Sequence, residues 1–325
     1  MSNVVEFRNF NLGFKDDEGK AYNLLNDVSF EIKEGVALGV VGESGCGKSM
    51  LSLSILRLLP EAAVVQSGDI LYKGDSILDK SISQLEEIRG KHISMIFQEP
   101  MTALNPVYTI GFQIGEALKT HYPKLDKKKI KEAVIDQLNK VGIPNPEARF
   151  DQYPHQFSGG MRQRAMIAMA MICNPQLLIA DEPTTALDVT IQAQVLELMK
   201  KIKLAGSLLL VTHNLGVVAE LCNEVIVMYA GCIVEKGDIK KVFKNPMHPY
   251  TKGLIAAVPG VEVSEGDLYT IPGTVPTIDK FENGCRFAPR CEYMSENCKG
   301  YIPTMKKVSE NHYVQCFLYD GKGDN

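Results

Sequence analysis

The stretch 36–49, VALGVVGESGCGKS, decides the fold class. Its first six residues have the apolar composition of a strand that is covered on both faces. The next eight residues match the pattern G-x-x-x-x-G-K-[ST] of a phosphate-binding loop, and the helical pattern SLSILRLL follows. A simple glycine-rich turn would not need the lysine, the serine and the helix together. The stretch therefore predicts a P-loop in an α/β domain.

This loop is expected to supply most of the contacts to a nucleotide. Its glycines allow the backbone N–H groups to point inward, and the following helix N-terminus adds partial positive charge. Lys48 is expected to reach the β- and γ-phosphates, and Ser49 to offer an oxygen to Mg²⁺. Cys46 is expected to be a small filler rather than a reactive thiol. The predicted nucleotide contacts in the loop are Gly42, Glu43, Ser44, Gly45, Cys46, Gly47, Lys48, Ser49 and Met50.

A second part of the site is predicted where the apolar run 177–180, LLIA, ends in Asp181 and Glu182. A pair of acidic residues is weak information by itself, because such pairs are common on surfaces. Directly after an apolar strand, in a chain that has a P-loop, the pair becomes strong evidence for the second half of the nucleotide site. Asp181 is expected to hold Mg²⁺, directly or through water, and Glu182 to orient and polarise the attacking water.

A second anion site is predicted at Phe157–Arg164, FSGGMRQR, which leads into the apolar helix AMIAMAMI. Ser158 can cap that helix, and Gly159 and Gly160 leave its first backbone N–H groups accessible. An ordinary helix start would not need two consecutive glycines. Two phosphate-binding helix starts with a single P-loop lysine suggest a site shared between two subunits.

The rest of the chain reads as two domains with a helical insertion. Apolar strands are expected at 36–41, 93–97, 177–180 and 208–212, which alternate with helices as in parallel α/β folds. Residues 109–157 carry a helix-period pattern with a lysine-rich face, expected as a helical insertion. After about residue 244 proline, glycine and loops predominate, which predicts a domain boundary there, so that residues 245–325 form a small C-terminal domain.

Composition limits the function classes. The chain has 325 residues, 45% hydrophobic and 23% charged, enough for a sizeable core. A net charge of -4 argues against general binding to nucleic acid or anionic lipid. No stretch approaches the roughly 18 apolar residues of a membrane span, and the first ten residues lack the pattern of a secretory signal. We expect a soluble or peripheral protein made in a reducing compartment.

These motifs, in this order over about residues 4–240, resemble the ATP-binding cassette (ABC) family. The resemblance implies an ABC-type nucleotide-binding domain over 1–244: a RecA-like core, an antiparallel β subdomain and a helical subdomain at about 99–165. Residues 158–163 resemble the family signature, here FSGGM rather than LSGGQ, which binds the γ-phosphate held by the opposite subunit of a head-to-tail dimer. Gln98 in IFQEP is similar to the Q-loop glutamine, which senses Mg²⁺ and the γ-phosphate.

The same resemblance assigns roles to three further places. Residues Ala186–Asp188 match the D-loop, and Asp188 is its acidic member. His213 in LLLVTHN matches the switch histidine that contacts the γ-phosphate. An aromatic side chain before the P-loop should stack on adenine, and Phe14 fits the spacing better than Tyr22.

The segments 97–107, 153–164 and 245–251, with the cysteines of the C-terminal part, resemble the ATPases of dipeptide and oligopeptide importers, a group with nickel and opine members. This resemblance implies an ATPase on the cytoplasmic face of the membrane. It implies two transmembrane permease subunits, a second and related ATPase subunit, and an extracytoplasmic solute-binding protein as partners. A short coupling helix of the permease would dock at Gln98–Pro106. A soluble ABC ATPase acting on nucleic acid or ribosomes, and a redox-sensing protein that merely binds nucleotide, are less favoured alternatives.

Four of the eight cysteines, Cys285, Cys291, Cys298 and Cys316, stand within 32 residues of a loop-rich segment. Such a segment needs a cross-link, and disulfides do not suit a reducing compartment. Structural zinc usually uses a C-x2–4-C knuckle, which is absent here, whereas iron–sulfur clusters tolerate wider spacing. Zinc and free thiols stay open as alternatives. The importer resemblance implies a [4Fe–4S] cluster, with Arg286, Phe287, Pro289 and Arg290 around the first pair of cysteines.

Overall fold

The computed structural model describes residues 2–16, 18–98, 103–185, 188–203, 206–258, 270–281 and 283–320. The chain divides into two compact units that interleave along the sequence. The first unit comprises Met1–Val4, Lys33–Gly35 and Asp79–Leu210, and the second comprises Val5–Ile32, Val36–Leu78 and Val211–Asn325. Each unit is described by itself below.

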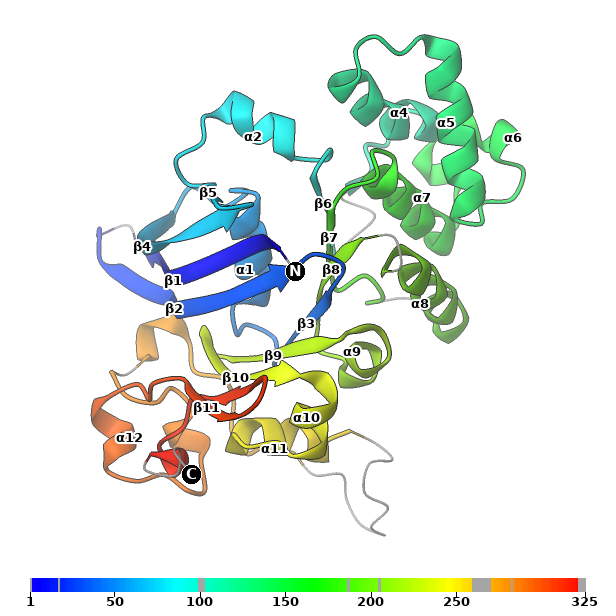
Figure 1. The fold of residues 1–325 in the computed structure, drawn as a ribbon. Coiled ribbons are helices and arrows are strands. Elements are labelled where there is room, and N and C mark those ends of the chain that lie inside the picture. The colour runs from blue at the N-terminus through cyan, green and yellow to red at the C-terminus, as the bar shows by residue number, and fades with distance from the viewer. Residues whose placement is uncertain are drawn as a thin grey trace. The chain divides into compact units, whose positions relative to one another are not determined.

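The second unit contains the strand that leads into the P-loop, β3 (Ala37–Val41), which is buried throughout. β3 pairs in parallel with β9 (Glu224–Tyr229), and β10 (Cys232–Asp238) pairs antiparallel with β9. β12 (His312–Val314) continues the sheet beside β10, and β11 (Lys306–Ser309) follows at its edge (Figure 1). Residues 245–325, which we call the tail, therefore contribute strands to the sheet of the P-loop.

A separate antiparallel sheet of the second unit has the strand order β2-β1-β4-β5. Its strands are β1 (Asn3–Lys15), β2 (Ala21–Lys33), β4 (Ala63–Tyr72) and β5 (Asp75–Ser76). One face carries an aromatic cluster in which Phe7 stacks on Phe30, with ring centroids 4.6 Å apart, and meets Phe10 edge-on. This is the antiparallel β subdomain that the family resemblance predicts.

The first unit contains the parallel strands β6 (Ile93–Ile96) and β7 (Leu177–Asp181). The next strand in the sheet order is β8 (Ser207–Thr212), of which the residues up to Leu210 belong to this unit. All three strands are buried along their whole length, which explains their continuous apolar sequences. The strands predicted from the sequence are confirmed, because each observed end lies within one residue of the predicted one.

Helices separate β6 from β7 in the chain, so the predicted helical insertion is confirmed. They are α4 (Ile110–His121), α5 (Lys127–Lys140), α6 (Pro146–Phe150) and α7 (Gly159–Met171), and they contact one another. In α5 the predicted apolar positions Val134 and Leu138 are fully buried, whereas Lys127–Lys129 are exposed. The helix period thus separates the core face from the solvated face.

The remaining elements are short or lie beside the sheets. They are α1 (Lys48–Ile55), α2 (Ile82–Ile88), η1 (Pro154–Gln156), α8 (Val189–Lys203), α9 (Leu215–Leu221), α10 (Ile239–Lys244), α11 (Pro249–Ala256), η2 (Ile278–Lys280), η3 (Ala288–Arg290), α12 (Asn297–Gly300) and η4 (Phe317–Tyr319). Among the described residues, none of the helices combines the length and apolar character needed to cross a membrane.

Candidate active site

The loop between β3 and α1 has the backbone of a phosphate-binding loop. Gly45 and Gly47 adopt the left-handed region, with φ of 80° and 100°, where side chains are strained. A Cβ atom on Gly47 would also lie 2.8 Å from Leu25 Cδ2. Gly47 caps α1 without a side-chain hydrogen bond to its first turn, so the N-terminal N–H groups of this helix are not occupied by a cap side chain.

Lys48 lies inside the loop and is 5% exposed. Its Nζ donates hydrogen bonds to the carbonyl oxygens of Gly42 at 2.8 Å and Glu43 at 2.9 Å. Cys46 is fully buried and its Sγ lies 3.8 Å from Nζ. Burial raises the pKa of the Cys46 thiol, so it stays protonated, as expected of a filler. Ser49 is exposed at the start of α1.

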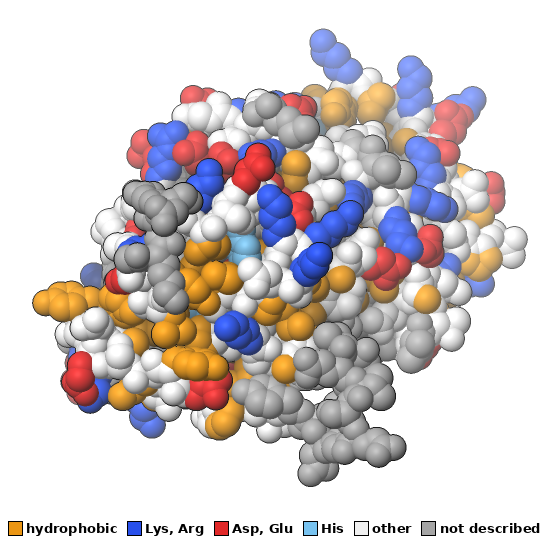
Figure 2. Space-filling view, turned by 60° about the horizontal axis from the view of Figure 1, so that its bottom comes forward, with side chains coloured by type: hydrophobic (Ala, Val, Ile, Leu, Met, Phe, Trp, Pro, Cys, Tyr) orange, Lys and Arg blue, Asp and Glu red, His pale blue; other side chains and the backbone are white. Residues whose placement is uncertain are grey.

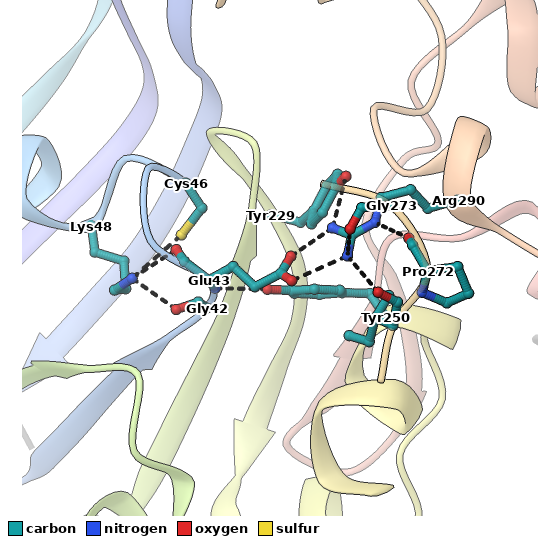
Figure 3. A network of polar contacts seen from close by, with 10 residues as sticks. Gly42, Glu43, Cys46, Lys48, Tyr229, Tyr250, Pro272, Gly273 and Arg290 are labelled. Atoms are coloured by element: carbon teal, nitrogen blue, oxygen red, sulfur yellow. Dashed lines mark hydrogen bonds and ion pairs between the residues drawn. The ribbon is translucent and has the colours of Figure 1, made fainter. Parts of the chain in front are cut away.

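The side chain of Glu43 faces residues of the tail. Its carboxylate forms an ion pair with Arg290 of the tail, 2.6 Å from Nη1, and its backbone N–H donates to the Tyr250 hydroxyl at 2.8 Å (Figure 3). The sequence pattern did not predict these two contacts. The only signal was an arginine in a loop-rich segment, and nothing local paired it with residue 43.

In the first unit, Asp181 ends β7 and is 4% exposed. Glu182 follows with a φ of 47°, a left-handed conformation that is uncommon for a residue with a side chain and recurs at functional sites. Thr185 donates a 2.6 Å hydrogen bond to the Glu182 carboxylate, and Gln163 of α7 donates one of 2.7 Å to the Pro183 carbonyl. The acidic pair and the α7 helix are thus tied together within one unit.

The two glycines of the signature segment have different surroundings. Ser158 caps α7 and accepts a 3.3 Å hydrogen bond from the Met161 N–H. Within the described part of the chain, a Cβ atom on Gly159 would meet nothing within 4 Å, whereas one on Gly160 would lie 2.8 Å from Ile191 Cδ1 of α8. Gly159 therefore leaves the helix start open, and Gly160 allows close packing of α7 against α8.

The other predicted residues are placed as follows. Gln98 is exposed just after β6, and His213 is exposed just after β8. Asp188 accepts a 3.0 Å hydrogen bond from the Ile191 N–H and so caps the start of α8. Phe14 is half-buried in β1. Ala186 and Leu187 of the predicted D-loop, and residues 99–102 of the predicted coupling segment, lie outside the described residues.

The predicted site residues fall into both units. The P-loop, Phe14 and His213 belong to the second unit, whereas Gln98, the signature segment, the acidic pair and Asp188 belong to the first. Their individual roles stay predictions.

The four tail cysteines line one pocket of about 100 Å³, together with apolar neighbours such as Phe287 and Leu318. The Cys285 N–H donates a 2.8 Å hydrogen bond to the Cys298 carbonyl, which joins the segment at Cys285 to α12. Burial, with smaller contributions from neighbouring thiols, raises the pKa of Cys285 to about 12. Over the described part of the chain, however, no group of three or more His, Cys, Asp or Glu residues is arranged to hold a metal ion. The predicted metal character of the tail is therefore not borne out by this geometry.

The other four cysteines, Cys46, Cys173, Cys222 and Cys232, are buried, in agreement with their interpretation as small apolar residues. The tail also exposes large apolar side chains, and Figure 2 shows hydrophobic side chains gathered at the left of the face that it presents. Among the described tail residues, the large apolar side chains that are exposed are Tyr293, Met294, Tyr301 and Leu318.

Comparison with known proteins identifies the family. Residues 25–185 match the model of the ABC transporter family, and residues 234–298 match that of the oligopeptide/dipeptide transporter C-terminal region. A putative peptide import ATP-binding protein of Brucella ovis is 51% identical, and the match covers 91% of each chain. The dipeptide transport ATP-binding protein DppD of Bacillus subtilis is 48% identical over 100% of this chain and 97% of its own.

Similarity to solved structures supports the same family assignment. A dimeric structure of the ATP-binding cassette MJ0796 bound to ADP and Pi has a TM-score of 0.65 at 25% identity, and covers 72% of this chain and 98% of its own. CbiO1 from Clostridium perfringens, part of an ABC transporter complex, has a TM-score of 0.63 at 26% identity over 75% of this chain and 92% of its own. The chain belongs to the ABC transporter family and is one of its ATPases. Within that family it carries the C-terminal region of the oligopeptide/dipeptide transporters.

Proposed function

We propose that this chain is the ATP-hydrolysing subunit of an importer of dipeptides or oligopeptides. The observation that carries the proposal is the full-length similarity to curated peptide-import ATPases, at 46 to 51% identity in Brucella ovis and Bacillus subtilis. The match extends through the C-terminal region, which lies beyond the ATP-binding motifs common to all ABC proteins.

The proposed reaction is transfer of the γ-phosphoryl group of ATP to water. The backbone N–H groups at the start of α1, with Lys48, would bind and orient the phosphates. The Glu182 carboxylate would hold the attacking water and accept its proton, and His213 would contact the γ-phosphate. No covalent intermediate is needed, because positioning and charge stabilisation provide the catalysis.

The donor set suits magnesium. The Ser49 hydroxyl, the Gln98 amide and the Asp181 carboxylate are hard oxygen donors of the kind that Mg²⁺ prefers. The ion, when bound, would neutralise negative charge on the β- and γ-phosphates. Asp181 ends a buried strand and is itself buried, which keeps its carboxylate in one place.

The signature segment is proposed to act on a partner subunit. The open backbone at Gly159 supports this role, because no atom of the described residues lies within 4 Å of the place where a Cβ atom would project. A head-to-tail pair of ATPase subunits would then close on ATP and reopen after hydrolysis. Two permease subunits would convert this motion into transport at the cytoplasmic face of the membrane, with an extracytoplasmic binding protein delivering the solute.

We further infer that the tail holds a [4Fe–4S] cluster through Cys285, Cys291, Cys298 and Cys316. Support comes from their position around one pocket. Cluster binding would require the thiols to lose their protons, which the raised pKa values of Cys285, Cys291 and Cys316 oppose in the metal-free chain. Metal analysis of anaerobically purified protein tests the inference: about four irons per chain are expected, and zinc without iron would overturn it.

The transported solute can be tested in cells that lack this chain. Complementation with the wild-type chain should restore uptake of a radiolabelled dipeptide, and a Lys48→Ala chain should not. Uptake of ⁶³Ni²⁺ measured in parallel tests the alternative that the same machinery serves nickel. Restored nickel uptake without restored peptide uptake would refute the peptide proposal.

A further inference from the structure

The tail segment Cys285–Cys291 contains two buried arginines that the proposed reaction does not use. The Arg290 side chain is 5% exposed, and Arg286 is 8% exposed. Buried guanidinium groups are costly unless their donors are paired. Both side chains reach out of the tail toward the parts of the second unit that surround the P-loop.

Arg290 forms a bidentate ion pair with Glu43 of the P-loop. Nη1 lies 2.6 Å from Oε2 of Glu43, and Nη2 lies 3.1 Å from Oε1 (Figure 3). The same guanidinium donates to the carbonyl oxygens of Pro272 at 2.7 Å and Gly273 at 3.2 Å. Burial alone would lower the pKa of Arg290, but the hydrogen bonds to Glu43 and Tyr229 outweigh it and raise the pKa. The guanidinium of Arg290 therefore stays charged, and its hydrogen bonds keep it oriented toward Glu43.

Tyr250 holds the main chain of the same loop residue. Its hydroxyl accepts the 2.8 Å hydrogen bond from the Glu43 N–H, and the residue is fully buried. Its ring packs against Tyr229 and Phe287, with centroids 4.7 Å and 5.4 Å away. Phe287 is part of the tail segment that carries the arginines. Both the side chain and the backbone of Glu43 are thus held by residues of the tail.

Arg286 supports the loop from a second direction. Its guanidinium donates to the carbonyl oxygens of Leu24, at 2.9 Å, and Ala230. The next residue, Gly231, donates a 2.8 Å hydrogen bond to the Cys46 carbonyl inside the P-loop. Arg290 therefore contacts the loop directly at Glu43, whereas Arg286 is connected to it at Cys46 through Ala230 and Gly231.

We propose that Arg290, assisted by Tyr250, is a positioning residue for nucleotide binding, which makes the tail a working part of the ATP site. A loop with glycines at positions 42, 45 and 47 loses much conformational freedom when it closes on phosphates. Contacts that hold the loop in place beforehand reduce this cost and so strengthen binding. This inference rests on the phosphate-binding role proposed for the loop.

The pocket of the four cysteines shares Cys285 and Phe287 with this arrangement. A change in the cysteine segment would therefore move the residues that hold Glu43. A structural change in the tail would thus alter the nucleotide site through direct contacts, without a change in any phosphate-binding residue.

The test compares Arg290→Met, Glu43→Gln and the double variant in the full chain, with MgADP binding measured by calorimetry. Each single variant should weaken binding by about tenfold, the size of one lost charge-assisted hydrogen bond. The double variant should bind no more weakly than Arg290→Met alone, because the ion pair that Glu43→Gln removes is already lost in that variant. Arg290→Lys should recover part of the affinity. Lys299→Met, at an exposed tail lysine that pairs with Glu296, is the matched control and should bind as the wild type does.

Wild-type affinity in a folded Arg290→Met chain, or additive losses in the double variant, would overturn the proposal. If Arg290→Met does not fold, Tyr250→Phe decides, because it removes only the hydroxyl that accepts the Glu43 N–H and should weaken binding by about threefold. Unchanged binding in that variant would also overturn it. Lys48→Ala distinguishes a failure of the phosphate-binding role proposed for the loop from a failure of the positioning role of Arg290. If Lys48→Ala binds MgADP normally, the phosphate-binding role of the loop is wrong. If it fails to bind while Arg290→Met binds normally, only the positioning role is wrong.

Discussion

The two helix starts proposed to bind phosphate, at α1 and at α7, are supported in opposite ways. At α7 the cap is local, because Ser158 caps the helix with its own side chain. At α1 the cap is Gly47 in a left-handed conformation, and the loop before it is held by residues about 200 or more positions away in the chain. The task proposed for both helix starts would thus depend at α7 on a short-range contact and at α1 on long-range contacts.

The difference follows from what each segment must do. The α1 loop is proposed to enclose the phosphates, a task that needs several consecutive inward N–H groups and leaves no room for a capping side chain. The α7 start is proposed to meet a nucleotide held by another subunit, so an open and rigid helix end is sufficient. A locally capped helix suits that task, and a glycine-rich loop needs external support.

The largest expected effect is a loss of ATP turnover on substitution of Glu182, a residue that belongs to neither helix start. Glu182→Gln keeps the shape of the side chain but removes the carboxylate proposed to accept the proton from water, so turnover should fall by about 100-fold or more. ATP binding should persist, and the dimer should be trapped in its closed form. Phosphate release and size-exclusion chromatography in ATP measure the two properties. Undiminished hydrolysis would show that Glu182 is not the base.

A matched pair of alanine variants tests the comparison itself. Gly47→Ala places a side chain at a φ of 100° and 2.8 Å from Leu25, so strain of about 1–3 kcal/mol is expected together with weaker MgADP binding. Gly159→Ala enters open space and should leave both stability and MgADP binding unchanged. It should instead reduce ATP-driven dimer formation, because the new methyl group covers the open helix start. Equal losses of MgADP affinity in both variants would contradict the division of roles.

The smallest effect concerns the local cap. Ser158→Ala removes the hydrogen bond from the Met161 N–H and should lower the free energy of unfolding by about 1 kcal/mol, a typical value for a lost helix cap. Urea denaturation measures it, and MgADP binding should not change. A larger loss of MgADP affinity than of stability would mean that the α7 start serves the nucleotide of its own chain.

Much of this protein could be predicted from its sequence. The strands and the P-loop were visible because each depends on a few consecutive residues: apolar runs mark buried strands, and glycine, lysine and serine at fixed spacing mark the loop. Individual side-chain roles were less accessible. The pattern suggested that both signature glycines open the backbone, but Gly160 serves the packing of α7 against Ile191.

What the sequence by itself determined is the chemistry that neighbouring residues can perform, together with the fold class and the family. Only the tertiary structure decided that Arg290 pairs with Glu43, that Tyr250 holds the backbone of the same residue, and that the tail strands join the P-loop sheet. The physical reason is the range of the contact. An ion pair between residues 247 positions apart leaves no periodicity or spacing in the sequence, and it exists only because folding brings the two charges together beside the P-loop.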